Sequence, residues 1–260
     1  MTIRVAVVGA TGRMGRLVSR LIDESGDFEL AAGISSKGEL SEMLGADVVV
    51  DVSVPAASQK VVDFALEHGL KVLVGTSGWT GERLGALAAR VGEDPAAGVI
   101  IVPNFSLGSV LSTRFAAMAA RYFDSIEVVE SHGATKIDSP SGTAIRTAEL
   151  MAAEREGSGR GLVAAPHTDQ RARGQQVAGI PVHSIRMQGI VAKQEVHFGG
   201  DGEVLTLSHE TVSPSAYEAG ILLALRALPE ARGLTIGLDA LLGLDDAADQ
   251  GGAPASRGSR

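Results

Sequence analysis

The N-terminal part of the chain alternates between short, almost continuous apolar runs and longer stretches with helical periodicity. Continuous apolar runs are typical of strands buried on both faces, and amphipathic stretches between them are typical of crossover helices. This alternation predicts βα units and a parallel sheet. The predicted strands are 3–8, 28–34, 47–53, 71–75 and 98–102. One predicted helix follows the first strand and ends at residue 22, and two others span 56–68 and 82–91.

The pattern changes after Gly108, where helices and strands no longer alternate regularly. The predicted helices are 110–122 and 143–156, and the predicted strands are 126–131, 182–187, 191–198 and 204–209. Gly199-Gly-Asp-Gly202 joins the last two strands and is a hairpin signal, so this half should contain an antiparallel or mixed sheet. With only two or three helices to cover it, we expect one sheet face to pack against another subunit.

The remaining segments complete an α/β fold: an N-terminal doubly wound parallel, Rossmann-type sheet plus a C-terminal α+β domain. Ser213-Pro214 is an N-cap followed by proline and opens a helix to about Leu228, before a strand at 234–238 and a short helix. We expect a dinucleotide-binding domain from 1–106 and 214–245, and a substrate-binding and oligomerisation domain from 107–213. Residues 157–179 are predicted to form a long mobile loop, and 246–260 a disordered tail.

Composition narrows the classes of function. The 260 residues carry a formal net charge of −8, which argues against general binding to nucleic acid or anionic membrane. Cysteine is absent, which excludes disulfides and thiolate metal sites, and no apolar run approaches the roughly 20 residues of a membrane span. A strand pattern begins at once without a leader, so we expect a soluble cytoplasmic protein. Histidines 68, 167, 183, 197 and 209 lack metal-ligand spacing, and no hydrolase nucleophile motif is present, so no metal is predicted.

A glycine-rich turn, Gly9-Ala-Thr-Gly12-Arg-Met-Gly15, follows the first strand and opens the first helix. Dinucleotides need this arrangement, because glycines let the backbone approach the pyrophosphate and the helix N-terminus attracts it. The spacing is GxxGxxG rather than the commoner GxGxxG, and a glycine turn without a ligand is the alternative. A P-loop is excluded, because no Gly-Lys-Ser/Thr follows.

Residues after the second strand bear on the choice of cofactor. An NAD-selective site usually carries an acid here for the ribose hydroxyls, whereas this chain has Ser35, Ser36 and Lys37. These residues favour or tolerate a 2′-phosphate, so we expect NADPH to serve at least as well as NADH. Exposed serines that only cap the strand are the alternative.

Further turns should edge the nicotinamide, because ligands of doubly wound sheets lie beyond the carboxyl ends of the strands. The turns in question are 51–55 and 75–79. In the segment after the next strand, 103–108, Asn104 and Phe105 could supply an amide contact and an apolar wall. Ordinary turn chemistry competes with that interpretation.

The stretch from Glu130 to Thr143 combines features suited to acid catalysis. His132 and Lys136 are two proton donors of different basicity, and they precede a Ser141-Gly142-Thr143 turn that opens a helix. Unpaired N–H groups at a helix start can bind a carboxylate, so the stretch suits acid catalysis on a small acidic substrate. A loop histidine with its own partner and a solvated lysine are the alternative.

Taken together, these motifs resemble the 4-hydroxy-tetrahydrodipicolinate reductase (dihydrodipicolinate reductase) family, over residues 3 to about 244. Four segments in the same order carry the resemblance: 8–15, 75–79, 103–106 and 130–143, of which the last is the most specific. The resemblance implies NAD(P)H-dependent reduction of a small cyclic dicarboxylate in the diaminopimelate route to lysine. Hydride passes from C4 of the nicotinamide to C4 of the cyclic imine, and the resulting enamine is protonated.

The resemblance also assigns residues. It implies that His132 and Lys136 are the acid pair, one of which supplies the proton, and that Gly142 and Thr143 bind a substrate carboxylate. The cofactor residues that it implies are Gly9, Ala10, Thr11, Gly12, Arg13, Met14, Gly75, Thr76, Ser77, Val102, Pro103, Asn104 and Phe105. It further implies a homotetramer built through the C-terminal sheet, and domain closure with hinges near Ser106 and Ser213.

The chain departs from the family pattern at Gly133, where the family usually has a second, substrate-contacting histidine. This departure leaves room for weaker substrate binding, a compensating residue or an altered substrate. Val52-Ser53 in place of Phe-Thr, and Gly-Thr-Ser-Gly in place of Gly-Thr-Thr-Gly, are mild changes that keep a hydroxyl. Two alternative functions remain: a related NAD(P)-dependent amine or diamino-acid dehydrogenase, and a cofactor-sensing protein without turnover.

Overall fold

The computed structural model describes residues 2–161, 163 and 170–244. The chain forms two compact units: residues Met1–Phe105 with Gly220–Arg260, and residues Ser106–Ala219. The chain therefore passes from one unit to the other after Phe105 and again after Ala219. The predicted disordered tail, residues 246–260, lies outside the described residues.

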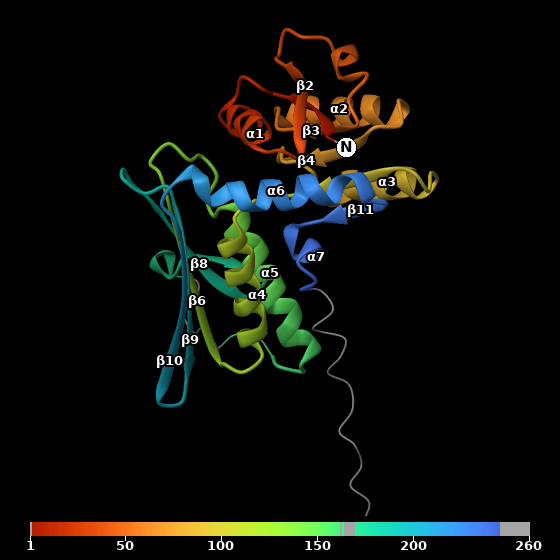
Figure 1. The fold of residues 1–260 in the computed structure, drawn as a ribbon. Coiled ribbons are helices and arrows are strands. Elements are labelled where there is room, and N and C mark those ends of the chain that lie inside the picture. The colour runs from red at the N-terminus through yellow and green to blue at the C-terminus, as the bar shows by residue number, and fades with distance from the viewer. Residues whose placement is uncertain (1, 162, 164–169, 245–260) are drawn as a thin grey trace, which may run out of the picture. The chain divides into compact units, whose positions relative to one another are not determined.

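The described residues of the first unit form a parallel sheet of six strands (Figure 1). The strands are β1 (Ile3–Val8), β2 (Phe28–Ile34), β3 (Val48–Asp51), β4 (Lys71–Val74), β5 (Gly98–Ile101) and β11 (Gly233–Ile236). Their order is β11-β5-β4-β3-β1-β2, and every pair is parallel. The order reverses direction at β1, which places a switch point between β1 and β3, where doubly wound sheets bind ligands.

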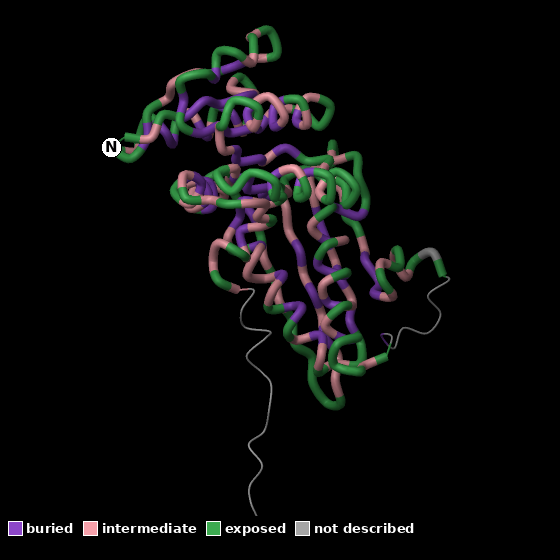
Figure 2. The backbone as a smooth tube through the Cα atoms, turned by 90° about the vertical axis from the view of Figure 1, so that its right-hand side faces the viewer, coloured by how far each residue is buried: buried purple, intermediate pink, exposed green. Residues whose placement is uncertain are grey.

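Helices cover both faces of this sheet. They are α1 (Arg13–Glu24), α2 (Pro55–Glu67), α3 (Gly81–Gly92), α6 (Glu218–Ala227) and α7 (Leu238–Leu241), with 3₁₀ turns η1 (Leu40–Met43) and η4 (Leu228–Glu230). Alternate strand positions such as Val49 and Val72 form one core cluster with residues of α2 and α3, while the intervening Val50 and Leu73 are also fully buried. Burial on both faces explains why these strands are continuous apolar runs. Figure 2 shows the buried residues along the strands and the exposed outer faces of the helices.

The described part of the second unit contains a mixed sheet ordered β10-β9-β6-β8-β7. Its strands are β6 (Ser125–His132), β7 (Gln175–Val177), β8 (Ile180–Arg186), β9 (Ala192–Gly200) and β10 (Glu203–Thr211). The other elements are α4 (Leu107–Ala120), α5 (Gly142–Gly157), η2 (Arg171–Arg173) and η3 (Pro214–Tyr217). The central strand β6 runs parallel to β8 and antiparallel to β9. The hairpin predicted at residues 199–202 joins β9 to β10.

Both α4 and α5 pack on the same face of this second sheet. Ala116 and Ala148 of these helices share a core with the strand residues Val128, Val196 and Phe198. The intervening strand residues face the other way and remain partly exposed, such as Glu127, Val129 and His197 on β6 and β9. One sheet face is therefore uncovered by the described helices, as the small number of predicted helices led us to expect.

The prediction of a loop over residues 157–179 is wrong near its C-terminal end, because residues 175–177 form β7. This short strand pairs with β8 across a two-residue turn, Ala178-Gly179, whose φ angles are +49° and +81°. Positive φ angles at both central residues are typical of a tight hairpin turn. Strand β7 lies at the edge of the sheet and is largely exposed, so its residues need not be apolar. The polar sequence Gln175-Gln176 therefore carries no apolar pattern that would predict a strand.

Candidate active site

The glycine-rich turn after β1 packs closely against its neighbours. Gly9 has a φ of +88°, in the region that glycine favours, and a Cβ there would lie 2.5 Å from the carbonyl oxygen of Val52. A Cβ at Gly15 would lie 2.1 Å from the carbonyl oxygen of Gly9. Gly12 is the N-cap of α1 and provides no side-chain cap. The first N–H groups of α1 therefore face a turn without side-chain bulk, which fits the pyrophosphate of a dinucleotide.

The other predicted residues of this turn lie around the start of α1. Ala10 donates its N–H to the carbonyl oxygen of Ile34 at 3.2 Å, which ties the turn to β2. The guanidinium of Arg16 donates to the carbonyl oxygen of Thr11. Arg13 and Met14 are the first two residues of α1. The turn is thus held by one hydrogen bond to the end of β2 and by another from a side chain of α1.

Asp51 ties together the carboxyl ends of β3 and β4. Its buried carboxylate accepts hydrogen bonds from the N–H of Ser53 at 3.1 Å and from the hydroxyl of Ser58. Its backbone carbonyl accepts the N–H of Gly75 at 2.8 Å and the hydroxyl of Thr76 at 3.3 Å. The two turns that were predicted to edge the nicotinamide therefore share one buried anchor.

The segment after β5 contributes a packed aromatic ring to the same edge of the sheet. A Cβ at Gly75 would lie 2.6 Å from Cε2 of Phe105, so the ring of Phe105 lies directly on the glycine backbone. The other predicted residues at this edge differ in burial: Val102 is buried, Asn104 is intermediate, and Ser77 and Pro103 are exposed. Because the carboxyl ends of neighbouring parallel strands meet at one edge, the first unit brings its predicted cofactor residues together.

The turn after β2 leaves Lys37 exposed. Ser35 accepts the N–H of Lys37 on its hydroxyl at 3.2 Å and the N–H of Gly38 on its carbonyl at 3.1 Å. The serine hydroxyl therefore supports the turn in the way expected of a serine that ends a strand. The lysine ammonium is the group of this turn that can reach an anion in solution.

In the second unit, His132 ends β6 beside a fully buried carboxylate. Glu130 precedes it by two residues, so both side chains point to the same sheet face, and Nδ1 of His132 lies 2.6 Å from Oε2 of Glu130. Arg186 stands opposite His132 on β8 and donates two hydrogen bonds to Glu130, from Nη1 to Oε2 at 2.9 Å and from Nη2 to Oε1 at 2.8 Å. The N–H of Ser141 donates to Oε1 at 3.2 Å.

These partners fix the charge of Glu130. Burial by itself raises the pKa of a carboxyl group, but hydrogen bonds from Arg186, Ser184 and His132 outweigh burial and hold the pKa of Glu130 below its ordinary range. Glu130 is therefore ionised at neutral pH. The bidentate guanidinium contact is the strongest type of partner available to a buried carboxylate.

Lys136 lies in the turn after β6 and pairs with a carboxylate of the same turn. Its Nζ lies 2.8 Å from Oδ2 of Asp138, and its N–H donates to the carbonyl oxygen of Gly133 at 3.1 Å. The hydrogen bond from Lys136 lowers the pKa of Asp138 below its ordinary value. Lys136 is thus near His132 in sequence, but its ammonium group is paired with the carboxylate of Asp138.

The predicted anion cradle forms the first turn of α5. Ser141 is the N-cap, and its buried hydroxyl accepts the N–H of Ala144 at 3.3 Å. Gly142 and Thr143 are the first two helical residues, whose N–H groups have no acceptor within the helix. Gly142 is exposed, and outside its chain neighbours and its own helix backbone nothing lies within 4 Å of the position that a Cβ there would take, so this end of the helix is accessible to solvent.

Gly133 lies between His132 and Lys136 in sequence and is partly buried. A Cβ at this position would lie 3.3 Å from the carbonyl oxygen of Ile190. A side chain at position 133 therefore fits only if this carbonyl moves by a few tenths of an ångström. The backbone around Gly133 is adapted to the glycine, which is where the family pattern has a histidine.

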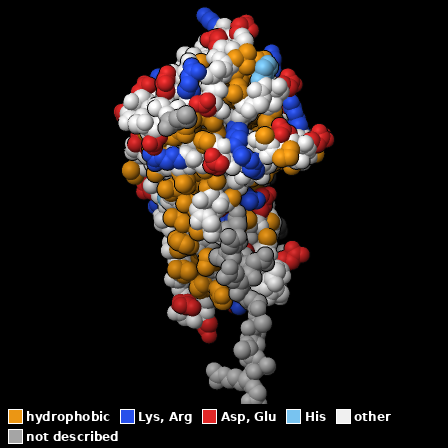
Figure 3. All heavy atoms as spheres, turned by 45° about the vertical axis from the view of Figure 1, so that its right-hand side comes forward, with side chains coloured by type: hydrophobic (Ala, Val, Ile, Leu, Met, Phe, Trp, Pro, Cys, Tyr) orange, Lys and Arg blue, Asp and Glu red, His pale blue; other side chains and the backbone are white. Residues whose placement is uncertain are grey.

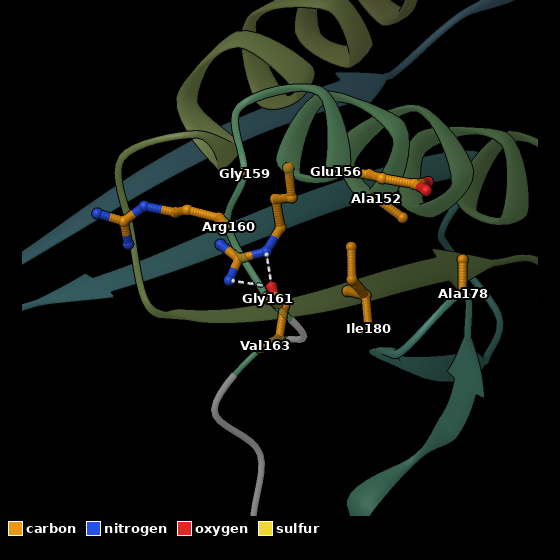
Figure 4. Close-up of a pocket in the computed structure, with 9 residues that line it drawn as sticks. Ala152, Glu156, Gly159, Arg160, Gly161, Val163, Ala178 and Ile180 are labelled. Atoms are coloured by element: carbon orange, nitrogen blue, oxygen red, sulfur yellow. Dashed lines mark hydrogen bonds between the residues drawn. The ribbon is translucent and has the colours of Figure 1, made fainter.

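A separate pocket of the second unit contains none of the predicted site residues. It measures about 590 Å³ and lies between the end of α5 and the start of β8 (Figure 4). Arg155 at its wall donates from Nη2 to the carbonyl oxygen of Gly161 at 2.9 Å and from Nη1 to that of Ala120 at 2.9 Å. These contacts satisfy the guanidinium structurally.

Other classes of site find no support in the part of the chain that the structure describes. Within residues 2–161, 163 and 170–244, no group of three His, Asp or Glu residues could hold a metal ion. No helix among the described residues is long and apolar enough to span a membrane. Exposed apolar side chains do occur in the second unit, including Phe115 and Met118 of α4 and Tyr122 in the turn after it, and Figure 3 shows hydrophobic side chains on the molecular surface.

Sequence reasoning missed Arg186, Asp51 and the role of Glu130. For Glu130 a signal existed, because a glutamate two residues before a strand histidine lies on the same face. For Asp51 the signal was a serine two residues after an aspartate at a strand end. Arg186 lies 56 residues from Glu130 in sequence and carries no local signal.

The depressed pKa of Glu130 predicts a pH-dependent stability. The ionised Glu130 should contribute to the free energy of unfolding at pH values above the unfolded-state pKa of about 4.3. This contribution should be lost as the pH falls through the lower folded-state pKa, because between the two pKa values the unfolded state binds more protons than the folded state. We therefore expect Glu130→Gln to flatten the fall in unfolding free energy below about pH 4.5. Urea unfolding across pH measures this, and equal slopes in both proteins would contradict it.

Family models match this chain over almost its whole length. The N-terminal model of dihydrodipicolinate reductase matches residues 3–105, and the C-terminal model matches residues 108–242. The 4-hydroxy-tetrahydrodipicolinate reductase of Clavibacter sepedonicus is 67% identical over 94% of this chain and 88% of its own length. The corresponding enzyme of Streptomyces griseus is 46% identical over 94% of this chain and 99% of its own length.

A solved structure gives the same answer. The dipicolinate-bound dihydrodipicolinate reductase of Paenisporosarcina sp. TG-14 is 29% identical, with a TM-score of 0.78 over 92% of this chain and 99% of that chain. The shared fold, the order of the motifs and the matched models agree. This chain belongs to the dihydrodipicolinate reductase family.

Proposed function

We propose that the first unit of this chain binds NAD(P)H and that the second unit binds and protonates the substrate. As a member of its family, the chain is an oxidoreductase that reduces 4-hydroxy-tetrahydrodipicolinate to tetrahydrodipicolinate in the diaminopimelate route to lysine. A bound dihydronicotinamide supplies the hydride. The chain itself supplies orientation, electrostatics and the proton.

In this proposal, His132 and Lys136 are the acid pair. The observation that carries the assignment is the His132 imidazole held by a buried ionised carboxylate, ten residues before the open N-terminus of α5. Lys136 adds a positive charge that is now paired with Asp138 at 2.8 Å. A substrate carboxylate would compete with Asp138 for the lysine, so binding and protonation both involve this ammonium group.

The substrate carboxylate is proposed to bind the first turn of α5. The N–H groups of Gly142 and Thr143 and the positive end of the helix dipole favour an anion there. Ser141 shapes this turn, because its own N–H and hydroxyl are engaged with Glu130 and Ala144. Gly133 leaves the neighbouring position without a side chain.

The cofactor proposal is that NADPH serves at least as well as NADH. Gly9 and Gly12 would admit the pyrophosphate beside α1, and the exposed Lys37 with Ser35 would face the adenosine ribose. An acid in this turn would repel a 2′-phosphate, and residues 35–37 contain none.

Replacing the acid pair tests the assignment. With substrate generated in place from pyruvate and aspartate semialdehyde by a synthase, we expect His132→Asn to lower kcat about 10²-fold or more, the size typical of a lost general acid. Lys136→Met should lower kcat/KM to a similar degree, while Lys136→Arg should recover substrate KM but not kcat if the lysine also donates a proton. NADPH and NADH oxidation are followed separately.

The matched control for these variants is His197→Asn. His197 lies on the opposite sheet face and bonds to the hydroxyl of Thr206 at 3.1 Å, so its loss should change kcat less than about twofold. Wild-type rates after replacement of His132 would overturn the assignment, and a much faster rate with NADH than with NADPH would overturn the cofactor proposal.

A homotetramer in the cytoplasm completes the proposal. The uncovered face of the second sheet carries exposed apolar side chains, with Ile185 42% and Val204 74% exposed, and a second copy could cover them. The cytoplasm is proposed as the compartment because NAD(P)H-dependent biosynthesis takes place there.

Sedimentation equilibrium tests the assembly directly. We expect a mass of about four times 26.7 kDa for the wild-type chain, and a smaller species for Val204→Lys, which places a charge on the uncovered face. Lys60→Ala on α2 in the first unit serves as the control. A wild-type monomer would contradict the proposed tetramer.

A further inference from the structure

Glu130 is a buried charge that contacts three segments of the second unit. Its side chain is fully buried, and a buried carboxylate is costly unless it is paired and hydrogen-bonded. The partners are His132 on β6, Arg186 on β8 and the N–H of Ser141 at the start of α5. An apolar side chain would fill this space at lower cost, so the charge calls for a functional explanation.

We propose that Glu130 is the positioning residue of His132 and that Arg186 holds Glu130 in the required place and charge state. The inference rests on the proposed role of His132 as the acid. Neither Glu130 nor Arg186 needs to touch the substrate. Both act through the orientation of the imidazole.

The hydrogen-bond inventory determines which nitrogen of His132 carries the bridging proton. An ionised carboxylate only accepts, and Arg186 donates to both oxygens of Glu130. The hydrogen between Glu130 and His132, at 2.6 Å, therefore belongs to Nδ1. Nε2 is then the ring nitrogen that exchanges protons with substrate, and the ring cannot rotate without losing the bond to Glu130.

The same ion pair also holds both ends of the segment between the acid and the anion cradle. Oε1 of Glu130 accepts the N–H of Ser141, whose side chain caps α5. Nη2 of Arg186 donates to the carbonyl oxygen of Asp138 at 2.6 Å, and the carboxylate of Asp138 pairs with Lys136. The distance between the imidazole and the carboxylate-binding turn is therefore set by one buried pair.

The chain contains its own matched control on the same strand. Glu127 lies on β6 but faces the uncovered side of the sheet, where it pairs with the guanidinium of Arg173 and with Nε2 of His183 at 2.7 Å. It thus has the same types of partner as Glu130, but its side chain is 33% exposed and its histidine is outside the proposed site. Glu127→Gln removes a comparable charge without touching His132.

A double-mutant cycle tests the inference in the full-length protein. We expect Glu130→Gln to lower kcat about 10²-fold with the NADPH dissociation constant unchanged, and Glu127→Gln to change kcat less than about twofold. In a His132→Asn background, Glu130→Gln should lower kcat by no more than about twofold, because residues that act as a unit are not additive. A merely structural role would instead multiply the two losses.

A second variant guards against simple misfolding, since Glu130→Gln leaves the partly buried guanidinium of Arg186 without its carboxylate. The double variant Glu130→Gln/Arg186→Met removes both charges and should fold, as judged by thermal unfolding and NADPH binding, yet lose kcat to the same extent. Wild-type kcat in this folded variant, or multiplied losses in the cycle, would overturn the inference while the proposed function stands. Wild-type kcat in His132→Asn would instead overturn the proposed role of His132 as the acid.

Discussion

The chemistry proposed for the second unit depends on the buried carboxylate of Glu130. It accepts bonds from Arg186 on a parallel neighbouring strand, from His132 on its own strand and from the start of α5. A charge in this position is tolerable only because every partner is present at once. Strand β8, the start of α5 and His132 are therefore connected through one hydrogen-bonded ionic site.

In the first unit, the burial of apolar strands is the main physical constraint. Its central strands β1, β3, β4 and β5 are buried on both faces over most of their length, so their sequence is almost wholly apolar, and the polar groups are confined to the strand ends. There the absence of a Cβ at Gly9 and Gly15 lets backbone segments meet closely, and Asp51 ties two of the turns together. The result is a sheet edge suited to a dinucleotide, whereas His132 and Lys136, the proposed acid pair, belong to the second unit.

Much of this could be predicted from the sequence, because the information was local. Apolar runs predicted the strands of the first sheet, and glycine spacing predicted the turn before α1. The short polar strand β7 was missed because an exposed edge strand needs no apolar pattern. Arg186 was missed because the register of β6 and β8, which no local pattern specifies, brings it opposite His132.

Some features of the proposed site could also be identified from local sequence, whereas others depend on contacts that only the structure shows. His132, Lys136 and the start of α5 lie in one stretch that sequence could identify, whereas the ion pair of Lys136 with Asp138 emerged only from the structure. Membership of the dihydrodipicolinate reductase family decides against the amine dehydrogenase alternative that Gly133 had kept open, and against the cofactor-sensor alternative. Gly133 itself lies close to the carbonyl of Ile190, so the glycine is integrated into the local backbone.

The most direct test of the account is the protonation pattern of the imidazole of His132. Nitrogen-15 NMR of histidine-labelled protein at high pH, with the signal assigned by its loss in His132→Asn, reports which ring nitrogen carries hydrogen. The account predicts a protonated Nδ1 and a bare Nε2, because Glu130 is an acceptor at 2.6 Å. A bare Nδ1 with hydrogen on Nε2 would contradict the central role given to the carboxylate of Glu130.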